Sequence, residues 1–344
     1  MQKHWFITGG LGFIGINTAL SLLREGAQVT VFDNYSRDGA EHNSELLAVE
    51  AEAEVIRGDL VCAESVENAL AKTTPDTILH LGAQVAVTTS VKKPRFDFES
   101  NAIGTFNLLE AARQYCPESA FLNASTNKVY GALSDLTVEE KESRYTLPDY
   151  PYGVPVERPL DFHTPYGCSK GAADQYVLDY ARIYDMPTVS FRQSCIYGPH
   201  QYGVEDQGWI AWFTIAVVLD RPITVYGNGK QVRDLLHVQD LVELYVTAAE
   251  NIDTVKGHVY NVGGGPSQTF SLRELLQYLS KLSNRTVDYS MDEWRPGDQP
   301  VYISDIRRAE EDLGWVPQIG PEGGVKELYD WVVDNQEEIE KVLG

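Results

Sequence analysis

The stretch "ITGGLGFIG", residues 7–15, decides the fold of this chain of 344 residues. It sets Gly9, Gly12 and Gly15 three residues apart, between a short apolar run and an amphipathic segment. Glycines between a strand and a helix let the backbone approach a pyrophosphate, whose charge then lies at the N-terminus of the helix. The stretch therefore predicts a dinucleotide-binding βαβ unit at the start of the chain.

A carboxylate follows this turn at the spacing that a ribose contact needs. Asp33 ends the second apolar run, "QVTVFD", eighteen residues after Gly15. An acidic residue at about this distance binds the adenosine ribose and disfavours a 2′-phosphate. The sequence therefore predicts NAD in preference to NADP, although Arg37 leaves NADP open. The other interpretation, that Asp33 only forms a turn before Asn34, is less attractive after such a glycine pattern.

Short apolar runs alternate with amphipathic segments over roughly the first 200 residues. This alternation predicts βαβ units and an α/β fold with a Rossmann-type doubly wound parallel sheet. The clearest helical segments are residues 105–114 and 171–184. The strand candidates are "HWFITG", "QVTVFD", "AEVIRGDL", "DTILHLGA", "SAFLNAST" and "PTVSFRQS".

The alternation loosens from about Arg192 into longer loops, a strand-like "ITVYGNG" and helices beginning at Asp240 and Ser271. Ser271 and Glu274 have the spacing of a capping box. We therefore expect two domains. The first is an NAD-binding Rossmann domain over residues 1–191, with a returning segment near 232–260. The second is a smaller α/β lobe for the substrate over residues 192–231 and 261–344.

Composition is that of an ordinary soluble protein, with 43% hydrophobic and 23% charged residues. The longest apolar stretch, "WIAWFTIAVVL" at residues 209–219, is too short to span a bilayer and predicts a buried helix. No apolar signal-peptide core precedes the glycines, and the four cysteines show no paired spacing. These features together predict a cytoplasmic protein.

The formal net charge of −22, from 50 acidic and 28 basic residues, argues against partners that are themselves anionic. We therefore expect no binding to nucleic acid and none to a membrane. This acidity fits either a high-salt habitat or colloidal solubility. The seven histidines include no pair spaced for a helical metal site, so no metal is expected.

Tyr166 and Lys170 stand four residues apart in "TPYGCSKGAADQY", and therefore on one face of the predicted helix. Lowering the pKa of a phenol from about 10 toward neutrality takes about 4 kcal/mol. A Lys ammonium and a positively charged nicotinamide ring could supply this together. Tyr166 would then take a proton from a substrate hydroxyl as hydride leaves for the cofactor. Alone, this spacing would indicate solvated helix surface, but after the dinucleotide fingerprint it predicts a catalytic pair.

Thr126 ends the apolar run "SAFLNAST" and leads into "NKVYGA". Strands of open parallel sheets present their carboxyl ends to a ligand, so Thr126 would face the site. From these residues alone, a strand end followed by a polar turn is the simpler interpretation.

The chain resembles the extended short-chain dehydrogenase/reductase family, the NAD-dependent nucleotide-sugar epimerases and dehydratases, over nearly its whole length. This resemblance implies NAD that is tightly bound and regenerated in each cycle, and a nucleotide-diphosphate sugar as substrate. The matching stretches are "TGGLGFIG", "FDNYSR", "GDL" at residues 58–60, "HLGAQ", "NAIGTFNLLEA", "STNKVYG", "YGCSK", "GNGKQVRDLLHV" and "RPGD".

The resemblance also implies roles for individual residues. Thr126 would hydrogen-bond the sugar oxygen being oxidised, with Tyr166 as the base and Lys170 as its partner. Arg233 and Arg295 match pyrophosphate-binding arginines, which suit bidentate phosphate contacts. The implied cofactor-binding residues are Gly9, Gly12, Phe13, Ile14, Gly15, Asp33, Asn34, Ser36, Arg37, Asp59, Leu60, Leu81, Ala83, Asn101, Tyr166 and Lys170. The implied substrate-binding residues are Gln84, Thr126, Asn127, Cys195, Arg233 and Arg295.

The chain departs from the patterns of its relatives at two places. Sugar-nucleotide 4,6-dehydratases carry an Asp-Glu pair after the Thr, where this chain has Asn127 and Lys128. An amide and an ammonium do not perform that acid and base work in the same way, so dehydration is disfavoured. Many members have Asn in "RxxNxYG", where this chain has Cys195 in "RQSCIYG", so a sugar or phosphate contact at this position would come from a thiol in place of an amide.

Within the family, the chain is most similar to the CDP-tyvelose 2-epimerases, also called CDP-paratose 2-epimerases. This favours a CDP-linked sugar, with epimerisation of a UDP-hexose at carbon 4 as the alternative and a non-catalytic NAD-binding regulatory protein as a less favoured one. The resemblance also implies a homodimer or homotetramer built on residues 105–114 and 171–184. The similarity rests on "STNKVYG", "PLDFHTPYGCSKGAADQYVLDYARIY", "DQGWIAWF" and a Pro- and Tyr-rich insert at residues 144–165, which is expected to line the sugar pocket or to form an exposed lid.

Overall fold

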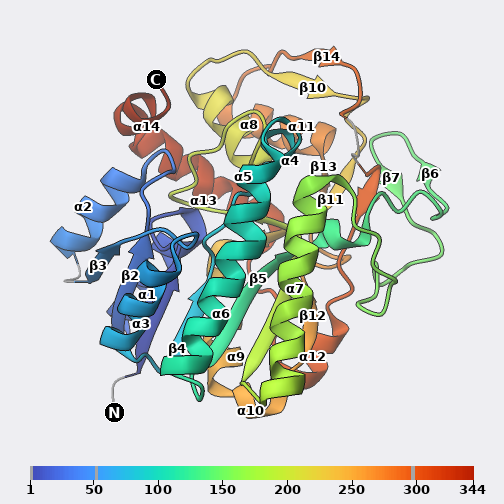
Figure 1. Ribbon diagram of the computed structural model, residues 1–344. Coiled ribbons are helices and arrows are strands. Elements are labelled where there is room, and N and C mark those ends of the chain that lie inside the picture. The colour runs from blue at the N-terminus through green and yellow to red at the C-terminus, as the bar shows by residue number, and fades with distance from the viewer. Residues whose placement is uncertain (1–2, 51–52, 296–298) are drawn as a thin grey trace. The chain divides into compact units, whose positions relative to one another are not determined.

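A seven-stranded sheet organises the larger part of the structure, a computed structural model that describes residues 3–50, 53–295 and 299–344 (Figure 1). Its strand order is β12-β8-β5-β4-β1-β2-β3, and the pairings of β1 with β2 and β4, of β2 with β3 and of β4 with β5 are parallel. The chain moves outward from β1 to β3 and then returns to β4 on the other side of β1. This reversal is the point at which open α/β sheets bind ligands. The strands are β1 (His4–Thr8), β2 (Gln28–Asp33), β3 (Glu54–Arg57), β4 (Thr77–His80), β5 (Ala120–Thr126), β8 (Thr188–Gln193) and β12 (Val259–Val262).

The predicted fold class is confirmed, since each of the six predicted runs contains one strand of this sheet. The seventh strand, β12, comes from a part of the chain where the alternation is already lost. The predicted helix at 171–184 is longer than expected, because it begins at Thr164 and so includes Tyr166 and Lys170 in its first two turns.

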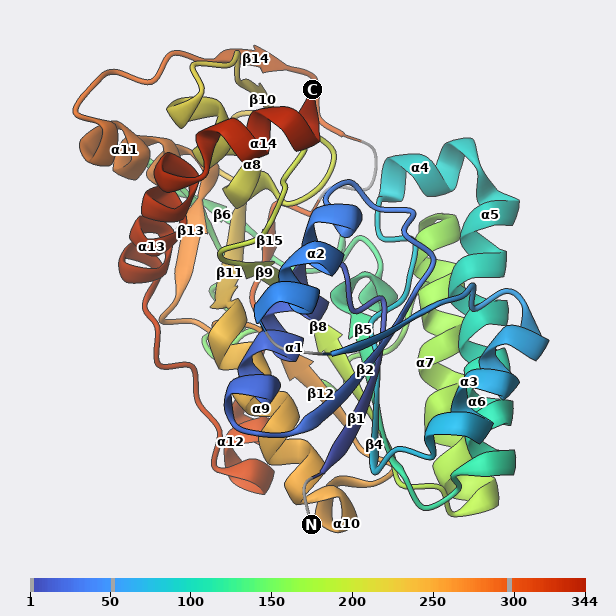
Figure 2. The same ribbon diagram turned by 90° about the vertical axis from the view of Figure 1, so that its left-hand side faces the viewer.

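Helices cover both faces of the sheet, with α3, α6 and α7 on one face and α1 and α9 on the other (Figure 2). Apolar side chains from the sheet, among them Phe6, Ile78 and Phe121, pack against Leu108 of α6 and Val177 of α7 to form one buried core. The helices of this part are α1 (Phe13–Arg24), α2 (Ala40–Glu50), α3 (Ala63–Thr73), α4 (Val87–Lys92), α5 (Pro94–Phe98), the π-helical turn η1 (Glu99–Ile103), α6 (Gly104–Tyr115), the 3-10 turn η2 (Asn127–Tyr130), α7 (Thr164–Tyr184), α9 (Val238–Glu250) and α10 (Ile252–Val255).

A second core forms around the predicted buried helix, which is confirmed as α8 (Trp209–Val218). It packs with helices α11 and α13 beside β11, the centre of a small mixed sheet. The capping box is also confirmed, because the Ser271 hydroxyl accepts the Glu274 N–H while the Glu274 carboxylate accepts the Ser271 N–H. The remaining elements are β6 (Glu139–Glu140), β7 (Tyr145–Thr146), β9 (Cys195–Tyr197), β10 (Thr224–Tyr226), β11 (Val232–His237), β13 (Thr269–Ser271), α11 (Leu272–Ser283), β14 (Ser290–Asp292), β15 (Val301–Tyr302), α12 (Arg307–Leu313), α13 (Pro321–Asp334) and α14 (Gln336–Leu343).

The chain divides into two compact units, of which the first comprises residues 1–129, 164–192 and 242–260 and the second residues 130–163, 193–241 and 261–344. The first unit contains most of the seven-stranded sheet and the second contains the mixed sheet. Residues 130–163 group with the second unit because their hydrogen bonds reach far along the chain, such as those from Asn261 Nδ2 to the Val154 carbonyl (2.8 Å) and from Tyr130 Oη to Asn261 Oδ1 (2.6 Å). In the described ranges no helix is both long and apolar enough to cross a membrane.

Candidate active site

The glycine turn between β1 and α1 is shaped by close backbone contacts. Gly9 has φ +67°, and a Cβ built on it would lie 2.7 Å from the Gly82 Cα. A Cβ on Gly15 would lie 2.5 Å from both the Gly9 carbonyl oxygen and the Gly10 Cα. The N-cap residue Gly12 offers no side chain to the first N–H groups of α1, which leaves them to an anionic ligand. This cradle fits a dinucleotide pyrophosphate.

Asp33 is joined directly to this turn. Its carboxylate accepts the Leu11 N–H at 3.1 Å and the Tyr35 N–H at 2.8 Å, at the carboxyl end of β2. Burial raises the pKa of Asp33, and these two backbone N–H groups oppose the rise. Each carboxylate oxygen keeps a further lone pair for a ribose hydroxyl, so the position fits the role predicted for it.

The other predicted cofactor residues lie in the loops that follow neighbouring strands. The loops after β2 and β3 are linked by a hydrogen bond from Asn34 Nδ2 to Asp59 Oδ2 (3.1 Å). The loops after β2 and β4 are linked by one from Arg37 Nη2 to the Ala83 carbonyl (3.5 Å). Because these loops all leave the carboxyl edge of one sheet, residues far apart in sequence are brought to one rim. The remaining members of this rim are Ser36, Leu60 and Leu81, while Phe13 and Ile14 begin α1.

Thr126, at the end of β5, and Tyr166, in the first turn of α7, form a hydrogen bond through their side chains. Both residues are buried, at 6% and 8% exposure. Burial raises the pKa of the Tyr166 phenol; the hydrogen bond with Thr126 and the charge of Arg37 lower it, and the charge of Asp97 raises it. The chain by itself therefore leaves Tyr166 less acidic than an ordinary tyrosine, so the lowering of the Tyr166 pKa expected from Lys170 and the nicotinamide together is not produced by the protein alone.

Lys170 is held one turn further along α7. Its Nζ donates a hydrogen bond of 2.6 Å to the Ala124 carbonyl on β5. Burial lowers the pKa of Lys170 to about 8, while the carboxylates of Asp174 and Asp97 raise it. Lys170 is thus close to losing its proton just above neutral pH, a position that ordinary surface lysines do not share.

Asn101 and Gln84 are joined to each other by two hydrogen bonds. The Gln84 N–H donates to Asn101 Oδ1 at 2.8 Å, and Asn101 Nδ2 donates to the Gln84 carbonyl at 3.0 Å. Asn101 lies in the π-helical turn η1, a local widening of the helix that is frequent at functional sites. Its amide also reaches Ser169 and Asp97, neither of which was predicted from the sequence. The four-residue spacing of Asp97 and Asn101 on a helix is the signal that could have found Asp97.

His80 is a further buried residue that the sequence did not single out. Thr105 Oγ1 donates to the Asn101 carbonyl at 2.6 Å, so it accepts a hydrogen bond from His80 Nε2 at 2.8 Å. His80 Nδ1 is then the acceptor for Thr8 Oγ1, which itself accepts the Gly82 N–H. Burial lowers the pKa of His80 to about 3, which fixes the neutral ring. This chain of bonds holds Gly82 against the glycine turn.

The predicted substrate-binding residues of the second unit, Arg233, Arg295 and Cys195, each contact other residues of that unit. Arg233, on β11, donates from Nη1 to the Val232 carbonyl at 2.8 Å. Arg295 pairs with Asp206 at 3.2 Å and stacks over Tyr226 at 4.0 Å, while residues 296–298 of the "RPGD" motif lie outside the described residues. Cys195 accepts a hydrogen bond from Trp209 Nε1 at 3.1 Å, so the thiol has a partner in place of the family's amide contact.

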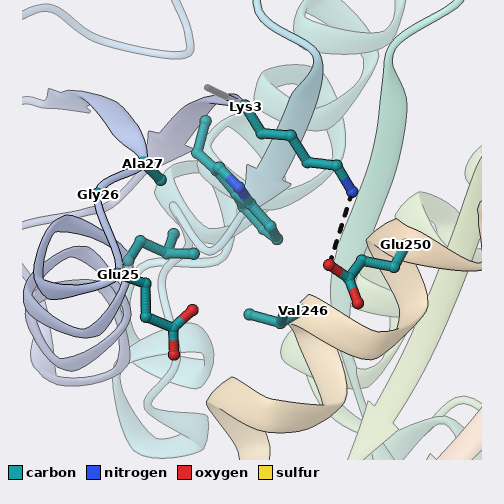
Figure 3. Close-up of a pocket in the computed structure, with 8 residues that line it drawn as sticks. Lys3, Glu25, Gly26, Ala27, Val246 and Glu250 are labelled. Carbon is teal, nitrogen blue, oxygen red and sulfur yellow. Dashed lines mark ion pairs between the residues drawn. The ribbon is translucent and has the colours of Figure 1, made fainter. Parts of the chain in front are cut away.

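A separate pocket of about 250 Å³ lies at the opposite, amino end of β1 (Figure 3). Lys3 and Glu250 form an ion pair at 3.9 Å beside Trp5 there. None of the predicted site residues lines it, so it is distinct from the candidate site. Within the ranges that the structure describes, no group of three or more His, Cys, Asp or Glu could hold a metal ion.

Comparisons with known proteins agree with this geometry. A family model described as GDP-mannose 4,6 dehydratase matches residues 6–328. CDP-paratose 2-epimerase of Salmonella typhi is 44% identical over 330 residues, which cover 94% of this chain and 98% of that protein.

Solved structures of similar proteins cover nearly the whole chain. UDP-glucose 4-epimerase from Thermotoga maritima with UDP-glucose has a TM-score of 0.83 at 27% identity, covering 97% of this chain and 99% of that one. UDP-glucose 4-epimerase from Thermus thermophilus in complex with NAD has a TM-score of 0.79 at 31% identity, covering 95% and 98%. These matches confirm the resemblance drawn from the motifs. The chain belongs to the NAD-dependent nucleotide-sugar epimerase and dehydratase family.

Proposed function

We propose that this chain is a CDP-paratose/CDP-tyvelose 2-epimerase, which inverts carbon 2 of a CDP-linked 3,6-dideoxy sugar. The observation that carries the proposal is the 44% identity to CDP-paratose 2-epimerase of Salmonella typhi over 94% of the chain. It is supported by the hydrogen-bonded pair of Thr126 and Tyr166 with Lys170 one turn away.

NAD would be held in the first unit by the glycine turn, by Asp33 and by the loops after β2, β3 and β4. When bound, NAD accepts a hydride from the sugar and returns it, so it is regenerated in each cycle. The buried, backbone-bonded setting of Asp33 supports tight retention of the cofactor, because two backbone N–H groups hold its carboxylate in place. The first unit is accordingly the proposed NAD-binding domain and the second the proposed nucleotide-sugar-binding lobe.

Tyr166 would take the proton of the sugar's 2-hydroxyl, while Thr126 orients that oxygen and Lys170 stabilises the phenolate. A 3,6-dideoxy sugar has no 3-hydroxyl to oxidise, and a ketone at carbon 4 would not acidify carbon 2. The direct route therefore passes through a transient 2-keto sugar, which turns over and accepts the hydrogen on its other face. Tyr166 then returns the proton to oxygen.

Turning the sugar requires that the nucleotide diphosphate stays anchored while the ring is free. Arg233 and Arg295 are the proposed anchors for the pyrophosphate, since guanidinium groups bind phosphate through paired hydrogen bonds. Gln84, Asn127 and Cys195 are the proposed contacts of the sugar. Asn127 and Lys128 follow Thr126 directly, so neither of the carboxylates that a dehydratase uses there is present, and dehydration is disfavoured.

Epimerisation of a UDP-hexose at carbon 4 is the second candidate, favoured by the likeness to UDP-glucose 4-epimerase from Thermus thermophilus at 31% identity. Product analysis separates the two. The purified protein is incubated with CDP-paratose and, separately, with UDP-glucose, and the sugars are resolved by NMR. Formation of CDP-tyvelose alone supports the proposal, whereas formation of UDP-galactose alone would replace it with the second candidate.

A further inference from the structure

Asp97 is a completely buried carboxylate at the base of the candidate site, with 0% exposure. Its Oδ2 accepts the Ser169 hydroxyl at 2.6 Å, and Ser169 immediately precedes Lys170. Its Oδ1 accepts Gln84 Nε2 at 2.7 Å and Asn101 Nδ2 at 3.3 Å. Asp97 thus joins α5, the loop after β4, η1 and the first turns of α7.

The backbone fixes the direction of both amide contacts. Asn101 Oδ1 accepts the Gln84 N–H, so the Asn101 NH₂ group must face Asp97. Gln84 Oε1 accepts the Ala86 N–H, so the Gln84 NH₂ group must also face Asp97. With the Ser169 hydroxyl, three donors surround one carboxyl group. Burial raises the pKa of Asp97, and the hydrogen bonds from Ser169 and Gln84 together with the charge of Lys170 oppose this rise and favour the ionised form.

All three of these donors are neutral, and in the described part of the chain Asp97 forms no ion pair with Lys or Arg. A buried charge without a counter-charge is costly, so a cation within electrostatic reach is needed. The cation that interacts with Asp97 is Lys170, which is itself buried at 4% exposure.

The other carboxylate near Lys170, Asp174, raises the pKa of Lys170 more than Asp97 does, but it already has a cationic partner of its own. Asp174, four residues along α7, pairs with Arg192 at 2.8 Å, and both side chains are buried. His80, on β4, also interacts with Lys170, but its ring is neutral. The charge of Asp97 raises the pKa of Tyr166, and the charge of Arg37 lowers it. Among these groups, Asp97 supplies the negative charge that no other cation balances.

We propose that Asp97 is the buried counter-charge that keeps Lys170 in its ammonium form, and that it thereby sets the alkaline limit of the reaction. Asp97 is a positioning residue, because it acts through Lys170. The effect on the reaction rests on the function proposed above, whereas the effect on Lys170 does not. Removing a negative charge beside an ammonium lowers the pKa of that ammonium, so Lys170 would lose its proton at a lower pH.

Asp97→Asn tests this, because Asn keeps an oxygen for the two amide donors and can turn its NH₂ group toward Ser169. Lysine labelled with ¹³C at Cε reports the titration directly, and the Lys170 signal is the one missing from the spectrum of Lys170→Arg. We expect the midpoint to fall by about one pH unit, the lower end of the effect of a nearby charge. The alkaline limb of kcat/KM should fall by the same amount, with the reaction retained at lower pH.

Glu99→Gln is the matched control, since it neutralises a carboxylate two residues away whose partner, Arg95, lies at 3.3 Å on the exposed side. It should leave both the Lys170 midpoint and the alkaline limb unchanged. If Asp97→Asn does not fold, Asp97→Ser removes the same charge from a smaller side chain and takes its place.

An unchanged or raised Lys170 midpoint in the neutral variant would overturn the inference, and so would an equal shift in Glu99→Gln. A lowered midpoint in a protein that converts neither CDP-paratose nor UDP-glucose would support the inference and reject the proposed function. The two failures are therefore distinguishable.

Discussion

At residue 166, burial and hydrogen bonding act in opposite directions on the pKa of the phenol. Burial raises the pKa, and Thr126 and Arg37 lower it. A phenol with a raised pKa stays protonated and cannot accept a proton, and a positive charge beside it favours the phenolate that can. Under the proposed function that charge would be the one on oxidised NAD, so we expect Tyr166 to remove a proton only in the cofactor-bound state.

Tyr166→Phe should lower turnover by about 10² to 10⁴ while leaving NAD and nucleotide-sugar binding nearly intact. The phenyl ring keeps the buried packing, but no group then takes the hydroxyl proton. Turnover comes from product analysis, and the binding constants from calorimetry. Loss of NAD binding equal to the loss of turnover would contradict a role in proton transfer.

Thr126→Val should also lower turnover, but only by about tenfold, because it removes one orienting hydrogen bond and keeps the base. The same assay measures it, with the thermal unfolding temperature as the control for packing. A loss as large as that of Tyr166→Phe would instead assign the proton transfer to Thr126.

At the scale of single elements, the β1–α1 turn depends on the smallest side chain. Gly15→Ala would place a methyl group 2.5 Å from backbone atoms of Gly9 and Gly10, which cannot move like the end of a flexible side chain. We expect a loss of about 1–3 kcal/mol in the free energy of unfolding, together with loss of the bound cofactor. Thermal unfolding and the nicotinamide content of the purified protein measure both.

Gly323→Ala is the control for this substitution. Gly323 lies within α13, where an added Cβ meets nothing within 4 Å. Alanine there should keep the nicotinamide content and stabilise the helix by up to about 1 kcal/mol. Wild-type nicotinamide content in Gly15→Ala would show that the turn tolerates a side chain and would reject its role as a pyrophosphate cradle.

Elements that carry a local pattern were predictable from the sequence, and those that depend on distant partners were not. β1 and β2 show as apolar runs beside a glycine turn, and the capping box shows as Ser271 and Glu274. Asp97 has one local partner, Asn101, four residues away, but its partners Gln84 and Ser169 lie 13 and 72 residues away. Cys195 was identified as a departure, but its bond to Trp209 appears only when the chain is folded.

The placement of residues 130–163 likewise depends on contacts with distant parts of the chain, which the sequence does not predict. This segment follows β5 in the sequence, so the first domain was expected to contain it. In the structure Asn261 and Tyr130 tie it to the second unit through partners more than 100 residues away. Propensity and turn chemistry carry no information on such contacts.

For the whole molecule, exposed apolar residues on two neighbouring helices predict a homodimer. Phe106 of α6 and Tyr176 and Ile183 of α7 are 38%, 49% and 61% exposed, and the rings of Phe106 and Tyr176 lie 5.7 Å apart. Burying such a surface against a second copy removes apolar area from water. Light scattering at micromolar concentration should give twice the monomer mass.

Tyr176→Glu combined with Ile183→Glu should convert the dimer to a folded monomer, because two charges would then lie in the contact. Val333→Glu, which changes another exposed apolar residue, on α13, is the control and should remain dimeric. A wild-type protein that scatters as a monomer would remove the prediction.

The reaction as a whole has an isotopic signature. Wild-type protein turning over CDP-paratose in heavy water should place no deuterium on carbon 2, since the hydrogen leaves and returns as hydride without meeting solvent. Mass spectrometry and proton NMR of the product measure this. Deuterium at carbon 2 would mean that the carbon is deprotonated and reprotonated, and the hydride route would have to be abandoned.

The seven-stranded sheet also determines the order in which the molecule can be completed during synthesis. β5 is finished at Thr126, but its neighbour β8 follows only at residues 188–193, and β12 only at 259–262. While the chain is still emerging from the ribosome, β5 therefore offers an unpaired backbone edge that another nascent chain could pair with. Chaperone-assisted translation should accordingly raise the yield of folded protein, because a chaperone covers the edge of β5 until its own β8 has been made, whereas slower translation alone would lengthen the exposure of that edge.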